Sequence, residues 1–288
     1  IVTRSSNGIN QLLRVSGTGE QLAALAQHPD IAWVEPYVQP QLHNSNAQVV
    51  VQTGRNATSR RLWTQGIKGE GQVVMTTDSG IDVTHDMFRD NAVPITTFGQ
   101  YPTHRKVLAY LLGSVNPQVT FGDHGSYHGT HTACTVAGTD DPAGVDAGDV
   151  RDGMAKYGKL IFSDLSGAAL GTGLDPFADL NDLYQPGYTG NAGGAARISS
   201  NSWGANVAGD YDLESMQVDQ FMWNHPDFLL FYSNGNATAG GSVGSPATAN
   251  SSVGVGSVRN GTSCNQYSTF TSRGPCADGR TKPEIVAP

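Results

Sequence analysis

Charged residues are scarce in this chain of 288 residues: Asp, Glu, Lys and Arg make up 15%, and the formal net charge is −8. Lys and Arg total 17 and form no basic run. Because proteins hold nucleic-acid phosphates with clustered Lys and Arg, the sequence argues against a nucleic-acid partner. The longest strongly apolar run, residues 228–232, is far shorter than the roughly 20 residues that span a bilayer, so we expect no membrane span.

Cysteine is scarce as well, with three in the chain. Cys264 and Cys276 flank a short loop and are candidates for a disulfide, which would contribute about 3 kcal/mol by closing a loop of about a dozen residues. Such a pair weakly favours an oxidising compartment, whereas Cys134 is expected to be a buried thiol. The chain begins at Ile1 without a basic, apolar leader, so we expect any signal peptide to have been removed or to lie outside this sequence.

Glycine is plentiful, with 36 residues, and the hydrophobic content is 38%. These values are typical of a loop-rich globular protein with one large domain or two. The first part has the pattern strand, helix, strand, at residues 12–15, 19–27 and 31–34, and predicts half of a small α+β unit. Residues 35–61 show no sustained period and are expected to be a linker or an extended segment.

A different pattern begins near residue 69 and alternates strands with helices. The apolar residues 73–77 predict a buried parallel strand that ends on Asp78. A helix is predicted over residues 213–224, with an apolar face of Met216, Val218, Phe221, Met222 and Trp223. Further strand candidates lie at residues 160–162, 197–201, 228–232 and 252–258. The alternation indicates an α/β fold with a doubly wound parallel sheet.

Two histidines three residues apart, His128 and His131, lie in a segment of small residues suited to the buried start of a helix. An imidazole exchanges a proton near neutral pH and is therefore a candidate general base. The alternative is a pair of structural core histidines. Asp78 and Asn236, each after a predicted strand, could meet His128 at one sheet edge, where a carboxylate orients the imidazole and an amide donates to an oxyanion.

The motifs around these residues resemble those of the subtilase family of serine proteases. They are residues 78–82 (DSGID), 128–131 (HGTH), 201–204 (NSWG), 233–236 (SNGN) and 268–288, which contain SRGP and KPEIVAP. Residues 196–205 (ARISSNSWGA) are similar to the alkaline, oxidation-resistant bacterial branch. The resemblance covers about residues 69–288 and implies a subtilisin-like three-layer α/β sandwich.

The resemblance also implies roles for individual residues. His128 would be the general base, Asp78 its orienting partner, Asn236 the oxyanion donor and His131 structural. Ala237 stands where some relatives carry an acid, so we expect the primary pocket to prefer apolar or uncharged side chains. The expected substrate-binding residues, which include two extended edges that pair with a peptide, are Ser166, Gly167, Ala168, Ser202, Trp203, Gly204, Ser233, Asn234 and Gly235.

By the same resemblance, residues 1–45 are expected to be the C-terminal half of an inhibitory propeptide with its linker, released by cleavage within residues 43–50. Residues 46–288 would be the peptidase domain, incomplete at its C-terminus. The family's nucleophile follows a Val-Ala-Pro stretch, so the serine is expected downstream of Pro288, in the same polypeptide or a separate remainder chain. Residues 261–264 (GTSC) precede the SRGP segment and are better explained as an Asn-Gly turn.

The metal content cannot be assigned from the sequence. Structural calcium is possible at the acidic segment Asp140, Asp141, Asp146, Asp149 and Asp152, although a solvated loop explains it better. No cofactor is expected for catalysis. Zinc bound by Asp123, His124, His128 and His131 is a weaker alternative, because the glutamate and spacing of zinc hydrolases are absent.

The leading hypothesis is a secreted serine endopeptidase with an Asp-His-Ser triad, made as a self-inhibited precursor. Its partners would be protein or peptide substrates and its own propeptide. The alternatives are a catalytically inactive fragment or pseudoprotease that binds peptides through the retained cleft, and a metal-dependent hydrolase.

Overall fold

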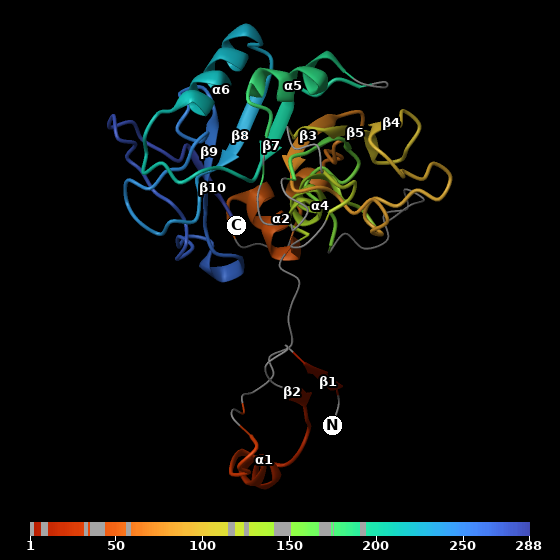
Figure 1. The fold of residues 1–288 in the computed structure, drawn as a ribbon, viewed down its shortest axis with the longest axis vertical. Coiled ribbons are helices and arrows are strands. Elements are labelled where there is room, and N and C mark those ends of the chain that lie inside the picture. The colour runs from red at the N-terminus through yellow and green to blue at the C-terminus, as the bar shows by residue number, and fades with distance from the viewer. Residues whose placement is uncertain are drawn as a thin grey trace. The chain divides into compact units, whose positions relative to one another are not determined.

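The computed structural model describes residues 3–6, 11–31, 34, 44–55, 59–114, 119–123, 127–140, 151–166, 174, 176–190 and 194–288. The chain separates into two compact units, Ile1–Leu42 and His43–Pro288 (Figure 1). In the described residues, no helix combines the length and the apolar character that a bilayer crossing requires.

The first unit contains a hairpin and one helix. Strands β1 (Thr3–Ser6) and β2 (Gln11–Arg14) pair antiparallel, and α1 covers Gly19–Ala26. Thr18 begins the helix with a capping box, in which its hydroxyl accepts from the Gln21 amide at 3.3 Å and the Gln21 side chain accepts from the Thr18 amide at 2.9 Å. The predicted helix and first strand are confirmed; the predicted strand at residues 31–34 includes residues outside those described.

The second unit is built on one eight-stranded sheet in the order β10-β9-β8-β7-β3-β6-β5-β4. Every neighbouring pair is parallel except β4 with β5. The strands are β3 (Val73–Asp78), β4 (Gly99–Gln100), β5 (Val107–Leu112), β6 (Lys159–Asp164), β7 (Ile198–Asn201), β8 (Leu229–Ser233), β9 (Val253–Ser257) and β10 (Ile285–Ala287). The predicted α/β class and parallel sheet are therefore confirmed.

Helices cover both faces of this sheet and give three layers (Figure 1). Met75 of β3 shares one apolar core with Tyr184 and Phe221 on one face, whereas Val74 shares a second core with Ala133 on the other. Both faces of the strand are thus buried, as parallel sheets require. The helices are α2 (Asn44–Thr53), α3 (Arg61–Thr64), α4 (His128–Ala137), α5 (Leu180–Thr189), α6 (Leu213–Asn224) and the 3₁₀ helix η1 (Gly261–Ser263).

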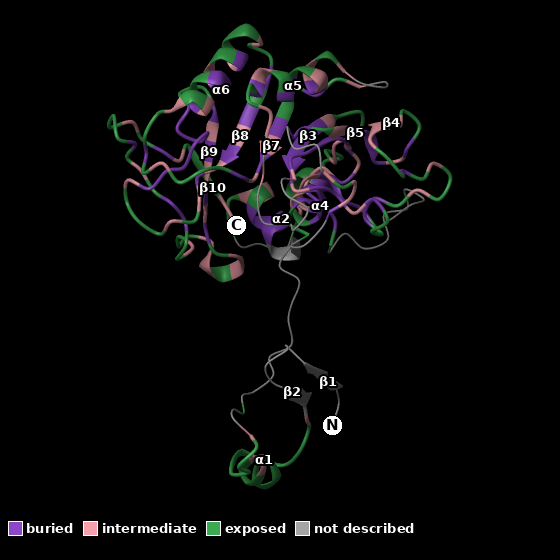
Figure 2. Cartoon of the chain, in the orientation of Figure 1, coloured by how far each residue is buried: buried purple, intermediate pink, exposed green. Residues whose placement is uncertain are grey.

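Two predicted elements need correction. Residues 44–53, expected to be linker or extended, form α2, in which Ala47, Val49 and Val50 are buried. The span of α6 is as predicted, but its predicted apolar face is wrong in part, because Trp223 is 85% exposed while Phe221 is buried. Figure 2 shows this contrast between the exposed outer side of α6 and the buried strands.

The predicted disulfide is contradicted, since Cys264 and Cys276 are both free thiols. Cys276 is buried within the same apolar core as Trp203 and Val243, whereas Cys264 is half-buried directly after η1. Nearness in the sequence therefore does not bring the two sulfur atoms together. Cys134 is a buried thiol, as predicted, and burial raises its pKa to about 12.

Candidate active site

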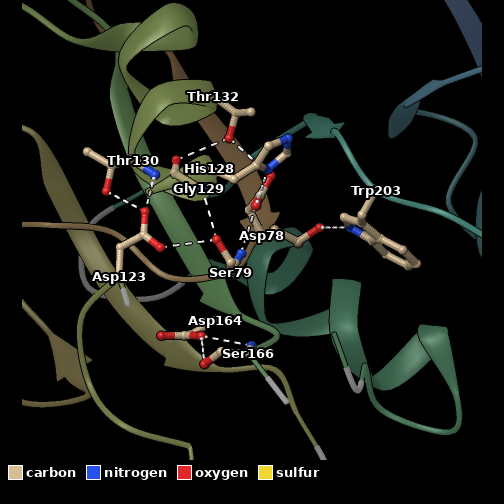
Figure 3. Close-up of polar contacts among 11 residues, drawn as sticks. Asp78, Ser79, Asp123, His128, Gly129, Thr130, Thr132, Asp164, Ser166 and Trp203 are labelled. Carbon is tan, nitrogen blue, oxygen red and sulfur yellow. Dashed lines mark hydrogen bonds and ion pairs between the residues drawn. The ribbon is translucent and has the colours of Figure 1, made fainter. Parts of the chain in front are cut away.

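The carboxyl ends of β3 and β6 place two buried acids side by side, with Asp78 opposite Asp164 in the parallel register. Helix α4 begins at His128 and packs over β3 (Figure 3). The Nδ1 atom of His128 lies 2.7 Å from Oδ1 of Asp78, whose side chain is 1% exposed, while half of the imidazole surface is open to solvent. The structure thus brings together two of the three residues expected at the catalytic centre.

The environment of this pair favours the charged imidazole. The hydrogen bond to the carboxylate of Asp78 raises the pKa of His128 above its usual 6.5, against the opposing effect of burial. The negative charges of Asp78 and Asp123 act in the same direction. The open face of the ring can accept a proton from a nucleophile and give it to a leaving group.

Two glycines, which carry no side chain, allow α4 to approach β3 this closely. A β-carbon on Gly129 would overlap the carbonyl oxygen of Gly80 and would lie 3.1 Å from the Asp78 side chain. Gly80 itself has φ of 114°, and a β-carbon there would overlap the carbonyl oxygen of Gly122. The small residues of the DSGID and HGTH motifs are therefore needed to bring the imidazole within hydrogen-bond distance of the acid.

Asp78 is held from two further sides. The Ser79 amide donates to Oδ1 at 2.8 Å, and the Thr132 hydroxyl donates to Oδ2 at 3.1 Å (Figure 3). Because Asp78 is buried, these donors supply the stabilisation that water gives an exposed carboxylate. No motif in the sequence indicates this role for Thr132.

A third buried acid, Asp123, ties the first turn of α4 to the end of β3. It accepts from the amide and the hydroxyl of Thr130 at 2.8 and 2.6 Å, and from the Ser79 hydroxyl at 3.1 Å. That hydroxyl in turn accepts from the Gly129 amide at 3.1 Å. Burial raises the pKa of Asp123. Asp123, which was a candidate zinc ligand in the sequence, is instead hydrogen-bonded to protein donors. The sequence feature that could have indicated a place in this site is its position five residues before His128.

Asp164 connects the sheet edge to the expected substrate-binding segment. Its Oδ1 accepts from the amide and hydroxyl of Ser166 at 3.0 and 2.6 Å, and its Oδ2 accepts from the Tyr110 hydroxyl at 2.7 Å. Burial raises the pKa of Asp164. Ser166 forms an isolated antiparallel bridge with Leu174, which is consistent with an extended edge. Gly167 and Ala168 lie outside the described residues.

The segment after β7 is anchored by Trp203. The indole nitrogen donates to the Thr77 hydroxyl at 2.8 Å, and the ring packs edge-to-face on Tyr232 with centroids 5.5 Å apart. Trp203 is 8% exposed, so its buried side chain anchors the segment to the core. Its neighbour Ser202 is half-buried, and a β-carbon on Gly204 would overlap the carbonyl oxygen of Ser245. What this segment can offer a peptide is therefore chiefly its backbone.

The expected oxyanion segment follows β8 at the same carboxyl edge of the parallel strands. Ser233 ends the strand, and the backbone amide of the buried Asn234 donates a hydrogen bond to the carbonyl oxygen of Val255 at 2.9 Å. Gly235 then turns the chain with φ of 103°, which leaves Asn236 exposed to solvent. The structure therefore places Asn236 at the sheet edge that holds Asp78, with its amide accessible.

The nucleophile is the one expected catalytic group without a position here. In the described part of the chain, no hydroxyl is hydrogen-bonded to Nε2 of His128. Ser263 lies in η1, and its amide donates back to Asn260 at 3.4 Å, so the GTSC segment forms a turn as predicted.

No group of three or more His, Cys, Asp and Glu is arranged to hold a metal among the residues described. Within the acidic segment, Asp140 lies 2.7 Å from Arg151, and Asp152 lies 3.4 Å from Lys156. These carboxylates face cationic side chains, which does not fit a calcium ligand set. The other three acids of the segment, and His124 of the zinc alternative, lie outside the described residues.

Comparison with known proteins shows which protein family this chain is similar to. The model of the subtilase family (Peptidase_S8) matches residues 69–288. Two Serine protease/ABC transporter B family proteins of Dictyostelium discoideum, tagA and tagD, are 33% and 32% identical over 214 and 194 residues. These matches cover 72% and 66% of this chain but 11% and 10% of the relatives, so the chain spans about a tenth of their length.

Solved structures agree on the fold. The Clostridium perfringens CspB protease matches with a TM-score of 0.61 and 12% identity, over 79% of this chain and 77% of that one. A cold adapted subtilisin-like serine proteinase matches with a TM-score of 0.53 and 20% identity, over 84% and 72% of the two chains. At these identities the likeness establishes a shared fold, which confirms the predicted subtilisin-like α/β architecture.

Proposed function

The chain belongs to the subtilase family, and on that premise we propose that it is the peptidase part of a secreted serine endopeptidase in which Asp78 and His128 activate a serine. Family membership supports a serine peptidase in general. The observation that carries the specific proposal is the 2.7 Å bond between a buried carboxylate and a half-exposed imidazole at the carboxyl edge of the sheet.

In the proposed reaction, Nε2 of His128 takes the proton of the serine hydroxyl while the serine oxygen bonds to the peptide carbonyl carbon. The carbonyl electron pair moves onto its oxygen, to which the amide of Asn236 donates. Collapse of this intermediate breaks the carbon–nitrogen bond, and His128 gives the proton to the departing amine. Water then gives a proton to the same imidazole as its oxygen bonds to the acyl carbon, and the bond from that carbon to the serine oxygen breaks as the imidazole returns the proton to the serine. Asp78 stabilises the imidazolium throughout.

The serine of this proposal lies C-terminal to Pro288 or in a remainder chain. Strand β10 runs parallel to β9, so its carboxyl end reaches the same edge as Asp78. A segment that follows β10 therefore begins at the same edge of the sheet as Asp78 and its partner His128.

Residues 1–45 are proposed to be part of an inhibitory propeptide. The compact unit Ile1–Leu42 supports a separate module at this end of the chain. Because residues 47–50 are buried within α2, a cut there would require the helix to open, so cleavage in the first part of the expected range, before Ala47, is favoured. Secretion rests on the family resemblance, since the free thiols of Cys264 and Cys276 remove the argument from a disulfide.

The test is hydrolysis of unstructured protein and short peptides by the full-length protein and three variants. Asp78→Asn should lower kcat by about 10⁴-fold and His128→Ala by about 10⁶-fold. His131→Ala is the matched control, because it removes an exposed imidazole one turn along the same helix. Hydrolysis that survives the loss of His128 would contradict the proposal. Peptide binding without hydrolysis would favour the inactive peptide-binding alternative.

A further inference from the structure

The hydroxyl of Thr132 lies between two acceptors. It is 3.1 Å from Oδ2 of Asp78 and 3.1 Å from the carbonyl oxygen of Gly129, three residues earlier in α4 (Figure 3). A hydroxyl has a single proton to donate. Because an ionised carboxylate is a stronger acceptor than a peptide carbonyl, that proton goes to Asp78 whenever the acid is charged.

The two oxygens of Asp78 are supported unequally. Oδ1 accepts from the Ser79 amide and faces Nδ1 of His128. Of the donors in the described ranges, only Thr132 reaches Oδ2. Without it, one oxygen of a carboxylate that is 1% exposed would be left unpaired, and the group could rotate about its terminal bond to find another donor.

The helix itself aims this hydroxyl. A threonine within a helix has few χ1 rotamers, and one of them turns its hydroxyl toward the carbonyl three or four residues before it. In α4 that rotamer also points the hydroxyl at Asp78. The backbone therefore sets the direction of the donor in advance.

We propose that Thr132 is a positioning residue: its hydroxyl fixes the second oxygen of Asp78, so that the first stays aimed at Nδ1 of His128. The consequence for rate rests on the proposed peptidase function, whereas the effect on the Asp78–His128 hydrogen bond does not. The two can therefore be measured separately in the same full-length protein.

The experiment compares Thr132→Val, which removes the hydroxyl at nearly constant shape, with Thr132→Ser, which keeps it. Thr135→Val is the matched control, since that hydroxyl, one turn along, donates to the His131 carbonyl at 3.1 Å and to no other group among the residues the structure describes. The Nδ1 proton of His128 is followed by NMR in protein with ¹⁵N-labelled histidine and assigned with Asp78→Asn. Initial rates with a peptide substrate give kcat and KM.

Thr132→Val should shift or broaden the hydrogen-bonded Nδ1 proton signal and lower kcat about tenfold, with KM changed less than about twofold. Thr132→Ser should largely restore both, and Thr135→Val should change neither. If valine prevents folding, Thr132→Ala removes the same hydroxyl in a better helix former.

The proposal is overturned if Thr132→Val leaves the proton signal unchanged, if Thr132→Ser is as impaired as valine, or if Thr135→Val is equally harmful. A protein that shows the expected signals but hydrolyses no peptide would contradict the proposed peptidase and still support the positioning role.

Discussion

A β-carbon on Gly129 would overlap the carbonyl oxygen of Gly80, so no side chain fits at this position between the start of α4 and the end of β3. This contact sets the distance between His128 and Asp78. Gly129→Ala should therefore force the helix away, lower kcat/KM by at least about tenfold and destabilise the fold by about 1–3 kcal/mol.

The measurement for Gly129→Ala is peptide hydrolysis together with denaturant unfolding. Gly240→Ala is a suitable control, because it lies in the same compact unit and a β-carbon there would meet only the Gly274 carbonyl oxygen, at an ordinary contact distance of 3.8 Å. Unchanged activity in Gly129→Ala would mean that the close approach does not position the imidazole.

The pH dependence of activity should follow His128. Its pKa is raised by Asp78, and only the neutral ring accepts a proton, so kcat/KM should rise with pH through a midpoint above 6.5. Since the folded pKa lies above the unfolded one, the pair's stabilisation is present below about pH 6.5 and is lost as pH rises through the folded value. An NMR titration of His128 should give the kinetic midpoint, and Asp78→Asn should lower it. A midpoint below 6.5 would contradict this assignment.

Asp123 should contribute to the stability of the fold as well as hold the first turn of α4 against the end of β3. Asp123→Asn replaces one of the oxygens that accept from Thr130 and Ser79 with an NH₂ group facing donors, so it should cost about 1–3 kcal/mol of unfolding free energy. Urea unfolding would measure this loss. The control is Asp140→Asn, which removes the charge of Asp140 from an exposed ion pair with Arg151. It should change the free energy of unfolding by less than about 1 kcal/mol. Equal effects of the two variants would rule out a special role for Asp123.

Ala237 should set the preference for the side chain before the cleaved bond. It is half-buried directly after Asn236, and its amide donates to the Ser272 hydroxyl at 3.0 Å. Peptides with Leu or Phe should be cleaved faster than those with Lys or Arg, and Ala237→Glu should shift the ratio toward Arg by about tenfold. Ala239→Glu is the matched control, because it adds the same charge at an exposed position two residues away. A native enzyme that prefers Lys or Arg would refute this pocket.

The sequence was sufficient to predict the strands that carry the site. A short apolar run bounded by glycines and ending on an acid, as in residues 73–78, is typical of a buried parallel strand. Helix α2 was not predictable in this way: its polar segment is helical in a context where Ala47, Val49 and Val50 are buried and Gln48 donates to the Asp152 carbonyl. Local pattern gives no sign of that partner, which lies 104 residues along the chain.

The same limit applied to the site. His128 and Asp78 were identified because their residue types and flanking glycines are distinctive. Asp123 and Thr132 act through partners in other segments, so their roles appeared only once the fold brought those segments together. The free thiol of Cys276 has a similar cause, since core packing rather than sequence spacing decides its neighbours.

Covalent labelling tests the central claim most directly. A fluorophosphonate probe reacts with a serine that is activated by an imidazole, forming an oxygen–phosphorus bond and releasing fluoride. The full-length protein should be labelled on one serine, located by mass spectrometry C-terminal to Pro288, and His128→Ala should abolish the label while His131→Ala keeps it. Absence of label in the folded protein after propeptide release, or a label that persists without His128, would contradict the account.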